Sequence, residues 1–142
     1  MGDNKNKAAK QASLKGKINS QRSALSSEKA KLRRIDEKIR RLQAARNKLK
    51  REINDLEKFK TEITEKLRSN SSRFSGDRQR KYHEKVNDVK SEVSNVISKH
   101  QRNLSLIEAK ISSLNEDYQG VDDAIYAARL IIDSLTTQYR NL

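Results

Sequence analysis

Few residues in this sequence have the type and spacing that catalysis or metal binding requires. His83 and His100 stand 17 residues apart, so on one helix they would lie about 25 Å apart and could not share a metal ion. His83-Glu84 resembles the start of a zinc-protease motif, but Val86 and Asn87 follow and no second histidine completes the motif. The chain has no Cys, which excludes disulfides, thiolate metal ligands and cysteine nucleophiles. The sequence predicts a protein that is not an enzyme and has no cofactor or metal.

Apolar residues recur at gaps of three and four along almost the whole chain, which is the period of a coiled coil. In the first half these positions are Leu14, Ile18, Leu25, Leu32, Ile35, Ile39, Leu42, Leu49, Ile53, Leu56, Ile63 and Leu67. The pattern pauses at residues 69–76 and resumes from Tyr82 to Leu142. The sequence therefore predicts an all-α fold, a long antiparallel two-helix hairpin. We expect a first helix from about Ala12 to Arg68 and a second that starts near Asp77.

The segment between the two predicted helices contains an aromatic-x-Gly motif, Phe74-Ser75-Gly76. Glycine permits the positive φ that a tight bend requires. The aromatic ring would close the open end of the apolar seam, by which we mean the line of apolar side chains along which the two helices pack. We therefore divide the chain into a basic, flexible N-terminus over residues 1–13 and a helical hairpin over residues 14–142, with its bend at about 69–76.

The composition suits two helices that share one narrow apolar seam. The chain is 33% hydrophobic, 36% charged and 4% aromatic, with no Trp and no Pro, and a globular core normally needs more apolar and aromatic residues. No apolar run approaches the roughly 20 residues of a membrane span. The N-terminus lacks the apolar core of a cleaved signal peptide.

Positive charge is concentrated in the first half. Residues 1–68 hold 21 Lys and Arg against 9 Asp and Glu, a net of +12, and residues 69–142 hold 11 against 10, a net of +1. The usual interpretation of such a run is a solvated helix face, with an acidic partner helix or a polyanion as alternatives. Only Phe59 in the basic half is available for base stacking before the bend, so specific nucleic-acid recognition is disfavoured.

Several positions depart from a simple apolar repeat. Gln21, Glu28, Arg46 and Lys60 occupy seam positions in the first helix, where polar residues fix register and orientation. In the second helix we expect an irregularity between Val93 and Leu104, and Gly120 marks either a close contact or a weak point. If the first helix starts near Ala12, the end of the second helix overhangs. Its contact stripe for a partner helix is predicted to be Ile125, Ile132, Leu135 and Tyr139.

The order of these features resembles the WXG superfamily of small helical hairpins, with Phe74-Ser75-Gly76 in place of Trp-x-Gly. More narrowly, about residues 14–142 resemble the YwqH-like small proteins of Gram-positive bacteria. The shared features are a Lys-rich first helix, the aromatic-x-Gly bend, an aromatic soon after it (Tyr82), and the apolar spacing of the last helix. In the last helix that spacing is carried by Ile107, Ile111, Leu114, Val121 and Ile125.

This resemblance implies an adaptor or chaperone that pairs with the N-terminal helices of an LXG-type toxin for type VII secretion, together with a second small WXG-like protein. It implies a bacterial cytoplasmic location, with co-export as a further option. Tyr118 and Asp122 match the Tyr-x-x-x-Asp secretion signal, although Tyr118 already serves the seam. Self-association, a generic coiled-coil structural or assembly role, and a basic nucleic-acid-associated role are the alternatives.

Overall fold

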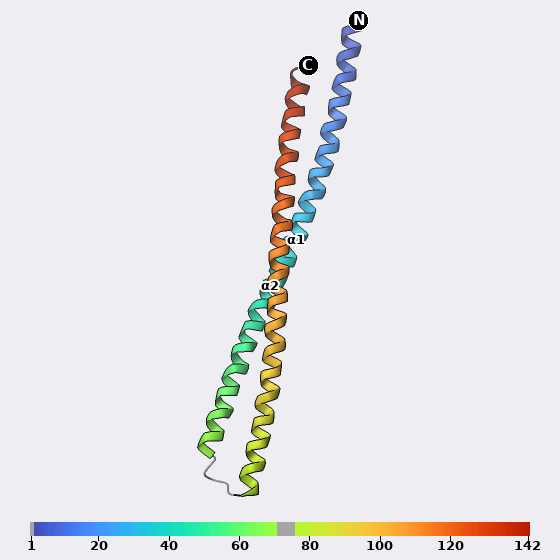
Figure 1. Ribbon diagram of the computed structural model, residues 1–142. Coiled ribbons are helices and arrows are strands. Elements are labelled where there is room, and N and C mark those ends of the chain that lie inside the picture. Colours follow the sequence, from blue (N-terminus) through green and yellow to red (C-terminus); the bar gives the residue numbers. More distant parts are fainter. Residues whose placement is uncertain (1, 71–75) are drawn as a thin grey trace. The chain divides into compact units, whose positions relative to one another are not determined.

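The computed structural model describes residues 2–70 and 76–142, which form two long α-helices in an antiparallel hairpin (Figure 1). Helix α1 runs over Gly2–Asn70 and helix α2 over Asp77–Arg140. The predicted all-α hairpin is therefore confirmed. Phe74 and Ser75 of the predicted bend motif lie outside the described residues.

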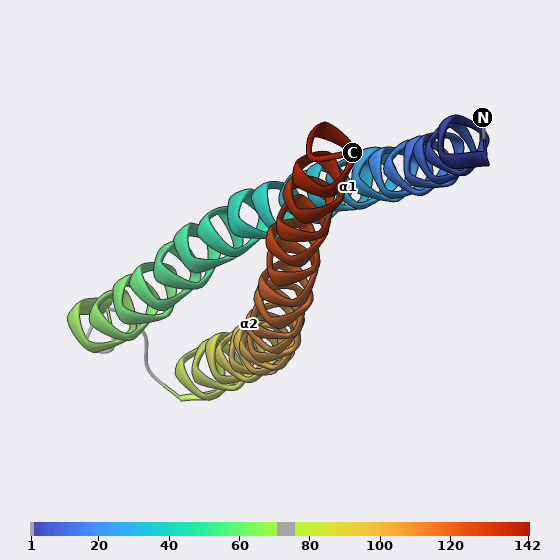
Figure 2. The ribbon, with the colours of Figure 1, turned by 90° about the horizontal axis from the view of Figure 1, so that it is seen from above.

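The hairpin divides into two compact units, and each unit is an antiparallel pair of helix segments. The terminal unit combines the part of α1 up to Arg40 with Ser112–Leu142, and the central unit is Arg41–Ile111. Figure 2 shows each helix as an unbroken ribbon along its length. Because the same two helices supply both units, the two units can be compared directly in sequence and burial.

Helix α1 begins at Gly2 rather than near Ala12, so the predicted start is wrong. The first residues are polar, but they include Ala8, Ala9 and Lys10 and contain no Pro. Alanine and lysine are good helix formers and polarity alone does not end a helix. Gln11 is half-buried and adds one more position to the seam. The predicted flexibility of residues 1–13 stays a prediction.

The buried and half-buried positions of α1 follow the seven-residue repeat without a break from Gln11 to Leu67. The four polar positions predicted for the seam, Gln21, Glu28, Arg46 and Lys60, are all half-buried. Their place in the seam is thereby confirmed. Phe59, beside Lys60, is exposed, so the lysine stem and not the aromatic ring occupies that position.

The irregularity in the seam repeat of α2 lies earlier in the chain than predicted. The half-buried positions Tyr82, Val86 and Lys90 are separated by two consecutive gaps of four, and from Val93 onward the gaps alternate regularly. The expected irregularity between Val93 and Leu104 is therefore wrong. The sequence pattern misled because Val89 is apolar yet exposed, while the long stem of Lys90 takes the seam position.

The start of α2 agrees with prediction. Gly76 has φ of +64°, the left-handed conformation that glycine adopts at little cost. The Arg80 N–H donates a hydrogen bond to the Gly76 carbonyl at 3.2 Å. The Asp77 carboxylate pairs with the Arg80 guanidinium and lies at the positive end of the helix dipole.

The core is a thin line of side chains rather than a compact centre. Among the described residues, nine apolar side chains count as buried, but none is less than 2% exposed. In the central unit, Ile53, Val93 and Ile97 form a buried cluster. In the terminal unit the most buried side chain is Ile125, at 4% exposure. Two helices alone thus leave the edges of the seam open to solvent.

Candidate functional site

The four residues predicted to bind a partner differ in how deeply they are buried in the seam. Ile125 is buried, Ile132 and Leu135 are half-buried, and Tyr139 is exposed at 37%. The predicted overhang of residues 132–142 is wrong, because α1 extends to Gly2 and covers this segment. Whether these four side chains bind a partner stays a prediction, and Tyr139 offers it the most open surface.

Two grooves flank the seam near the ends of the terminal unit. One, of about 510 Å³, is lined by Lys10, Ser13, Leu14, Lys17, Gln138, Asn141 and Leu142. The other, of about 310 Å³, is lined by Lys15, Ile18, Asn19, Arg22, Thr136, Tyr139 and Arg140. Besides seam residues, the first groove is lined by residues that stand immediately before a seam position in the sequence. The second groove is lined by residues that stand immediately after one, so the two grooves lie on opposite sides of the seam. Each has an apolar floor and a cationic rim.

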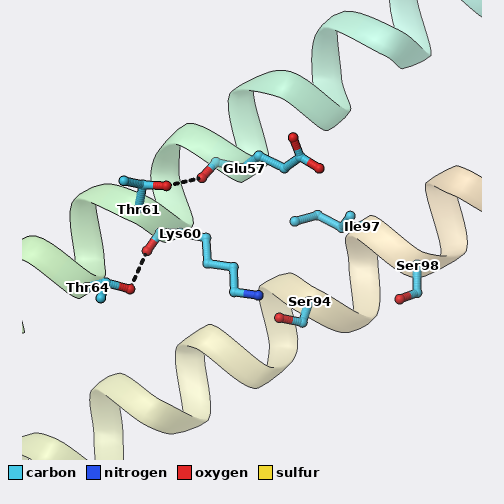
Figure 3. Close-up of a pocket in the computed structure, with 7 residues that line it drawn as sticks. All are labelled: Glu57, Lys60, Thr61, Thr64, Ser94, Ile97 and Ser98. Atoms are coloured by element: carbon cyan, nitrogen blue, oxygen red, sulfur yellow. Dashed lines mark hydrogen bonds between the residues drawn. The ribbon is translucent and has the colours of Figure 1, made fainter.

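The central unit has a groove of about 520 Å³ around the Lys60 side chain (Figure 3). The Lys60 stem extends across the seam toward Ser94 of α2. The Thr61 hydroxyl donates to the Glu57 carbonyl at 3.1 Å and the Thr64 hydroxyl to the Lys60 carbonyl at 2.9 Å. These two hydroxyls are used within α1, so the groove presents mainly the Lys60 stem, the Glu57 carboxylate, Ile97 and the two serines of α2.

The two histidines do not meet. His100 is half-buried, with its Nε2 atom 3.7 Å from Glu52 Oε2, an ion pair when the imidazole is protonated. His83 packs edge-on against Tyr82, with ring centroids 6.2 Å apart. Within residues 2–70 and 76–142, no group of three His, Cys, Asp or Glu side chains is placed to hold a metal ion. No helix in this part of the chain is long and apolar enough to cross a membrane.

The two shorter motifs have different surroundings. Tyr118 is half-buried in the seam and Asp122, one turn later, is exposed. Only the aspartate of the possible secretion signal is therefore fully open to solvent, and the signal stays a prediction. Of the bend motif, Gly76 is the member that the structure describes, and its positive φ fits the predicted turn.

Large apolar side chains also face outward on α2, which the seam pattern did not predict. Leu106 is 69% exposed, Tyr126 66%, Leu130 52% and Ile131 45%. Tyr126 and Leu130 stand four residues apart, both off the seam register, so they share the face of α2 that points away from α1. That spacing is the sequence signal that could have revealed this outward face.

A hairpin with an open seam, cationic grooves and an outward apolar face has the features of a binding protein, and these features alone do not specify a family. Searches of curated proteins and of solved structures returned no match. The model of the YwqH-like family matches residues 16–137, from Gly16 of α1 to Thr137 of α2. Because this match spans well over half of the chain, the protein belongs to the YwqH-like family.

Proposed function

We propose that this protein is a non-enzymatic helical adaptor or chaperone that pairs with the N-terminal helical region of an LXG-type toxin destined for type VII secretion. The observation that carries the proposal is the incompletely covered seam of a YwqH-like hairpin. Two helices leave the side chains of this seam partly exposed, and no described residue has a fully buried side chain. A third helix in the groove between α1 and α2 would complete that burial.

The terminal unit is the part of the seam best suited to a third helix. Its two grooves are lined by seam residues such as Leu14 and Ile18, and their rims carry Lys15, Lys17 and Arg22. None of these three cations makes an ion pair with a described residue. A partner helix with an apolar stripe and acidic flanks would therefore match both the floor and the rim.

The proposal is tested by co-expressing this chain with the N-terminal helical region of an LXG-type toxin from the same genome. We expect the two chains to co-purify and the toxin fragment to be more soluble with its partner. Replacing Tyr139→Ser together with Arg22→Glu, which changes floor and rim of one groove, should weaken capture by tenfold or more, as truncation of buried interface anchors commonly does.

The matched control is Leu106→Ser, which changes an exposed apolar residue of the central unit. It should bind like the unchanged chain. Failure of the unchanged chain to capture the toxin fragment would contradict the proposed function. Equal capture by the groove variant and the control would show that the toxin uses a different surface.

A second candidate function is binding to a polyanion through the outward face of α1. Arg33, Arg34, Arg40 and Arg41 form two pairs one seven-residue repeat apart and all are exposed. Such a spacing aligns guanidinium groups along one face, where they could neutralise phosphates. If this is the function, affinity for duplex DNA should fall steeply with salt and be lost on reversal of both pairs to glutamate. Negligible DNA binding at about 0.15 M salt would exclude it.

A further inference from the structure

The outward face of α2 in the terminal unit combines apolar side chains with carboxylates that make no ion pair among the described residues, although Asp123 accepts a hydrogen bond from the Gln119 side chain at 3.0 Å. Tyr126 and Leu130 are exposed there, and Ile131, which precedes the seam position Ile132, is exposed at the edge of this face. Residues 112–142 hold 5 acidic and 2 basic residues, a net of −3 in a chain whose net charge is +13. Within the described chain none of those five carboxylates makes an ion pair. This is an acidic, apolar helix face for which the hairpin itself supplies no cationic partner.

The outward face of α1 in the same unit has the opposite character. From residue 9 to residue 30, every position that points away from the seam is small or uncharged. These are Ala9, Ala12, Ser13, Gly16, Asn19, Ser20, Ser23, Ser26, Ser27 and Ala30, and all but the half-buried Ala30 are exposed. In a solvated coiled coil such positions usually carry charge. Nothing described lies within 4 Å of a Cβ built on Gly16.

Cations border this small-residue face on both sides. All bordering positions except Ala24 are cationic, and they hold Lys10, Lys15, Lys17, Arg22, Lys29 and Lys31. Residues 2–40 contain 12 basic and 4 acidic residues, a net of +8. The α1 face is therefore a strip of small side chains between two rows of mostly cationic residues, whereas the α2 face carries large apolar side chains among carboxylates.

We propose that a second copy of this chain docks laterally on the terminal unit, with the α2 face of one copy against the α1 face of the next. Large side chains such as Tyr126 and Leu130 would fit between the small residues of the neighbour's α1, because small residues let helices approach closely. The aspartates of α2 would meet the lysines of α1. The two faces of one molecule are therefore complementary to each other in both charge and shape.

The partner face is α1 of the second copy rather than its α2. An α2-to-α2 contact would bring two segments of net −3 together, and like charges across an interface are unfavourable. Because the two complementary faces point away from each other across the hairpin, the contact is head-to-tail. Such a contact adds further copies until a ring closes and does not stop at a dimer by symmetry.

The test uses the full chain alone and two variants. Tyr126→Ser with Leu130→Ser removes the large apolar side chains of the α2 face, and Ser20→Glu with Ser27→Glu places acidic side chains in the α1 strip. All four residues are exposed, and glutamate favours a helix over serine, so both variants should keep the hairpin. Leu106→Ser is the matched control. Masses are measured by light scattering and sedimentation over a concentration series at about 0.15 M salt.

We expect the unchanged chain and the control to form species larger than a dimer as concentration rises. Each double variant alone should associate at least about tenfold more weakly. Mixed together, the two variants should form a 1:1 dimer and nothing larger, because each retains the face that the other has lost. A monomeric unchanged chain, an unresponsive mixture, or an α1 variant that still dimerises by itself would overturn the proposal. No toxin is present in this test, so its result does not depend on the proposed function.

Discussion

The central and terminal units share one seven-residue repeat but use their charges differently. In the central unit two contacts between charged groups cross between the helices, with Lys50 Nζ 3.8 Å from Glu108 Oε1 and His100 Nε2, when protonated, 3.7 Å from Glu52 Oε2, whereas the pair of Asp77 and Arg80 lies within α2. In the terminal unit the ion pairs stay within α1, in the i,i+3 and i,i+4 geometry of a single helix. They are Lys31–Glu28 and Arg40–Asp36, at 3.2 and 3.1 Å.

The distribution of net charge sharpens this contrast. In the central unit, residues 41–70 of α1 hold 9 basic and 5 acidic residues, a net of +4, and residues 77–111 of α2 hold 8 and 5, a net of +3. In the terminal unit the two segments carry +8 and −3. Opposite charges on adjacent helices that form no ion pair between them in the described chain remain available to other molecules. We infer that the charged side chains of the terminal unit are the ones left to bind another molecule.

The strongest test of this contrast removes a buried anchor from each unit in turn. Ile125→Ala in the terminal unit and Ile53→Ala in the central unit should each lower the free energy of unfolding by about 2–5 kcal/mol, because a cavity is left in the seam. Hydrogen exchange should locate the loss in the mutated unit. Leu130→Ala, at an exposed position, should change stability by less than about 0.5 kcal/mol. Equal loss of protection in both units after either change would mean that they do not act as separate units.

A second test concerns the polar residues of the seam. The Nε atom of Arg46 in the central unit is buried without a hydrogen-bond partner in the described part of the chain. Such a group destabilises by about 1–3 kcal/mol, so Arg46→Leu should raise the melting temperature. Gln21→Leu in the terminal unit is the matched comparison and should give a smaller gain. A lower melting temperature for Arg46→Leu would show that the arginine stem contributes more than its unsatisfied atom costs.

Arg46 also illustrates what could be predicted from sequence. The apolar repeat predicted the hairpin, the polar seam positions and the start of α2, because a repeat of three and four dictates which residues face a partner helix. It placed the irregularity of α2 wrongly, since hydrophobicity favours Val89 over the lysine stem that occupies the seam.

The binding surface was harder to predict than the fold. The length of α1 decides whether residues 132–142 overhang, and a polar N-terminus gives no apolar pattern by which to set that length. The outward residues Tyr126 and Leu130 lie off the seam register, so the seven-residue repeat does not identify them. A partner surface depends on what remains uncovered after folding, which requires the burial of each side chain and not its spacing alone.

Replacing one glycine in each unit by alanine should have a smaller effect on stability. Gly120 lies within α2 of the terminal unit, and no described atom lies within 4 Å of a Cβ built there, so the close contact considered from sequence is absent in the described chain. Gly120→Ala should therefore stabilise the hairpin by about 1 kcal/mol through helix propensity. Gly76→Ala should do the reverse, because alanine is strained at φ of +64°. Thermal melts of the two variants check both signs, and a destabilising Gly120→Ala would imply a contact with another molecule.

The smallest expected effect belongs to the ion pair between Lys50 and Glu108 in the central unit. Both side chains are about half exposed, at 52% and 49%, and their closest atoms are 3.8 Å apart. Exposed pairs of this kind contribute roughly 0.2–1 kcal/mol and weaken with salt. A double-mutant cycle with Lys50→Met and Glu108→Gln should give a coupling energy within that range, measured from unfolding curves at low and high salt. The intrahelical pair Arg40–Asp36 of the terminal unit is the matched comparison, since it acts within one helix. If the coupling energy across the central unit were close to zero at both salt concentrations while the terminal pair contributed more, electrostatic attraction between helices would not distinguish the two units. The contrast would then rest on apolar burial alone.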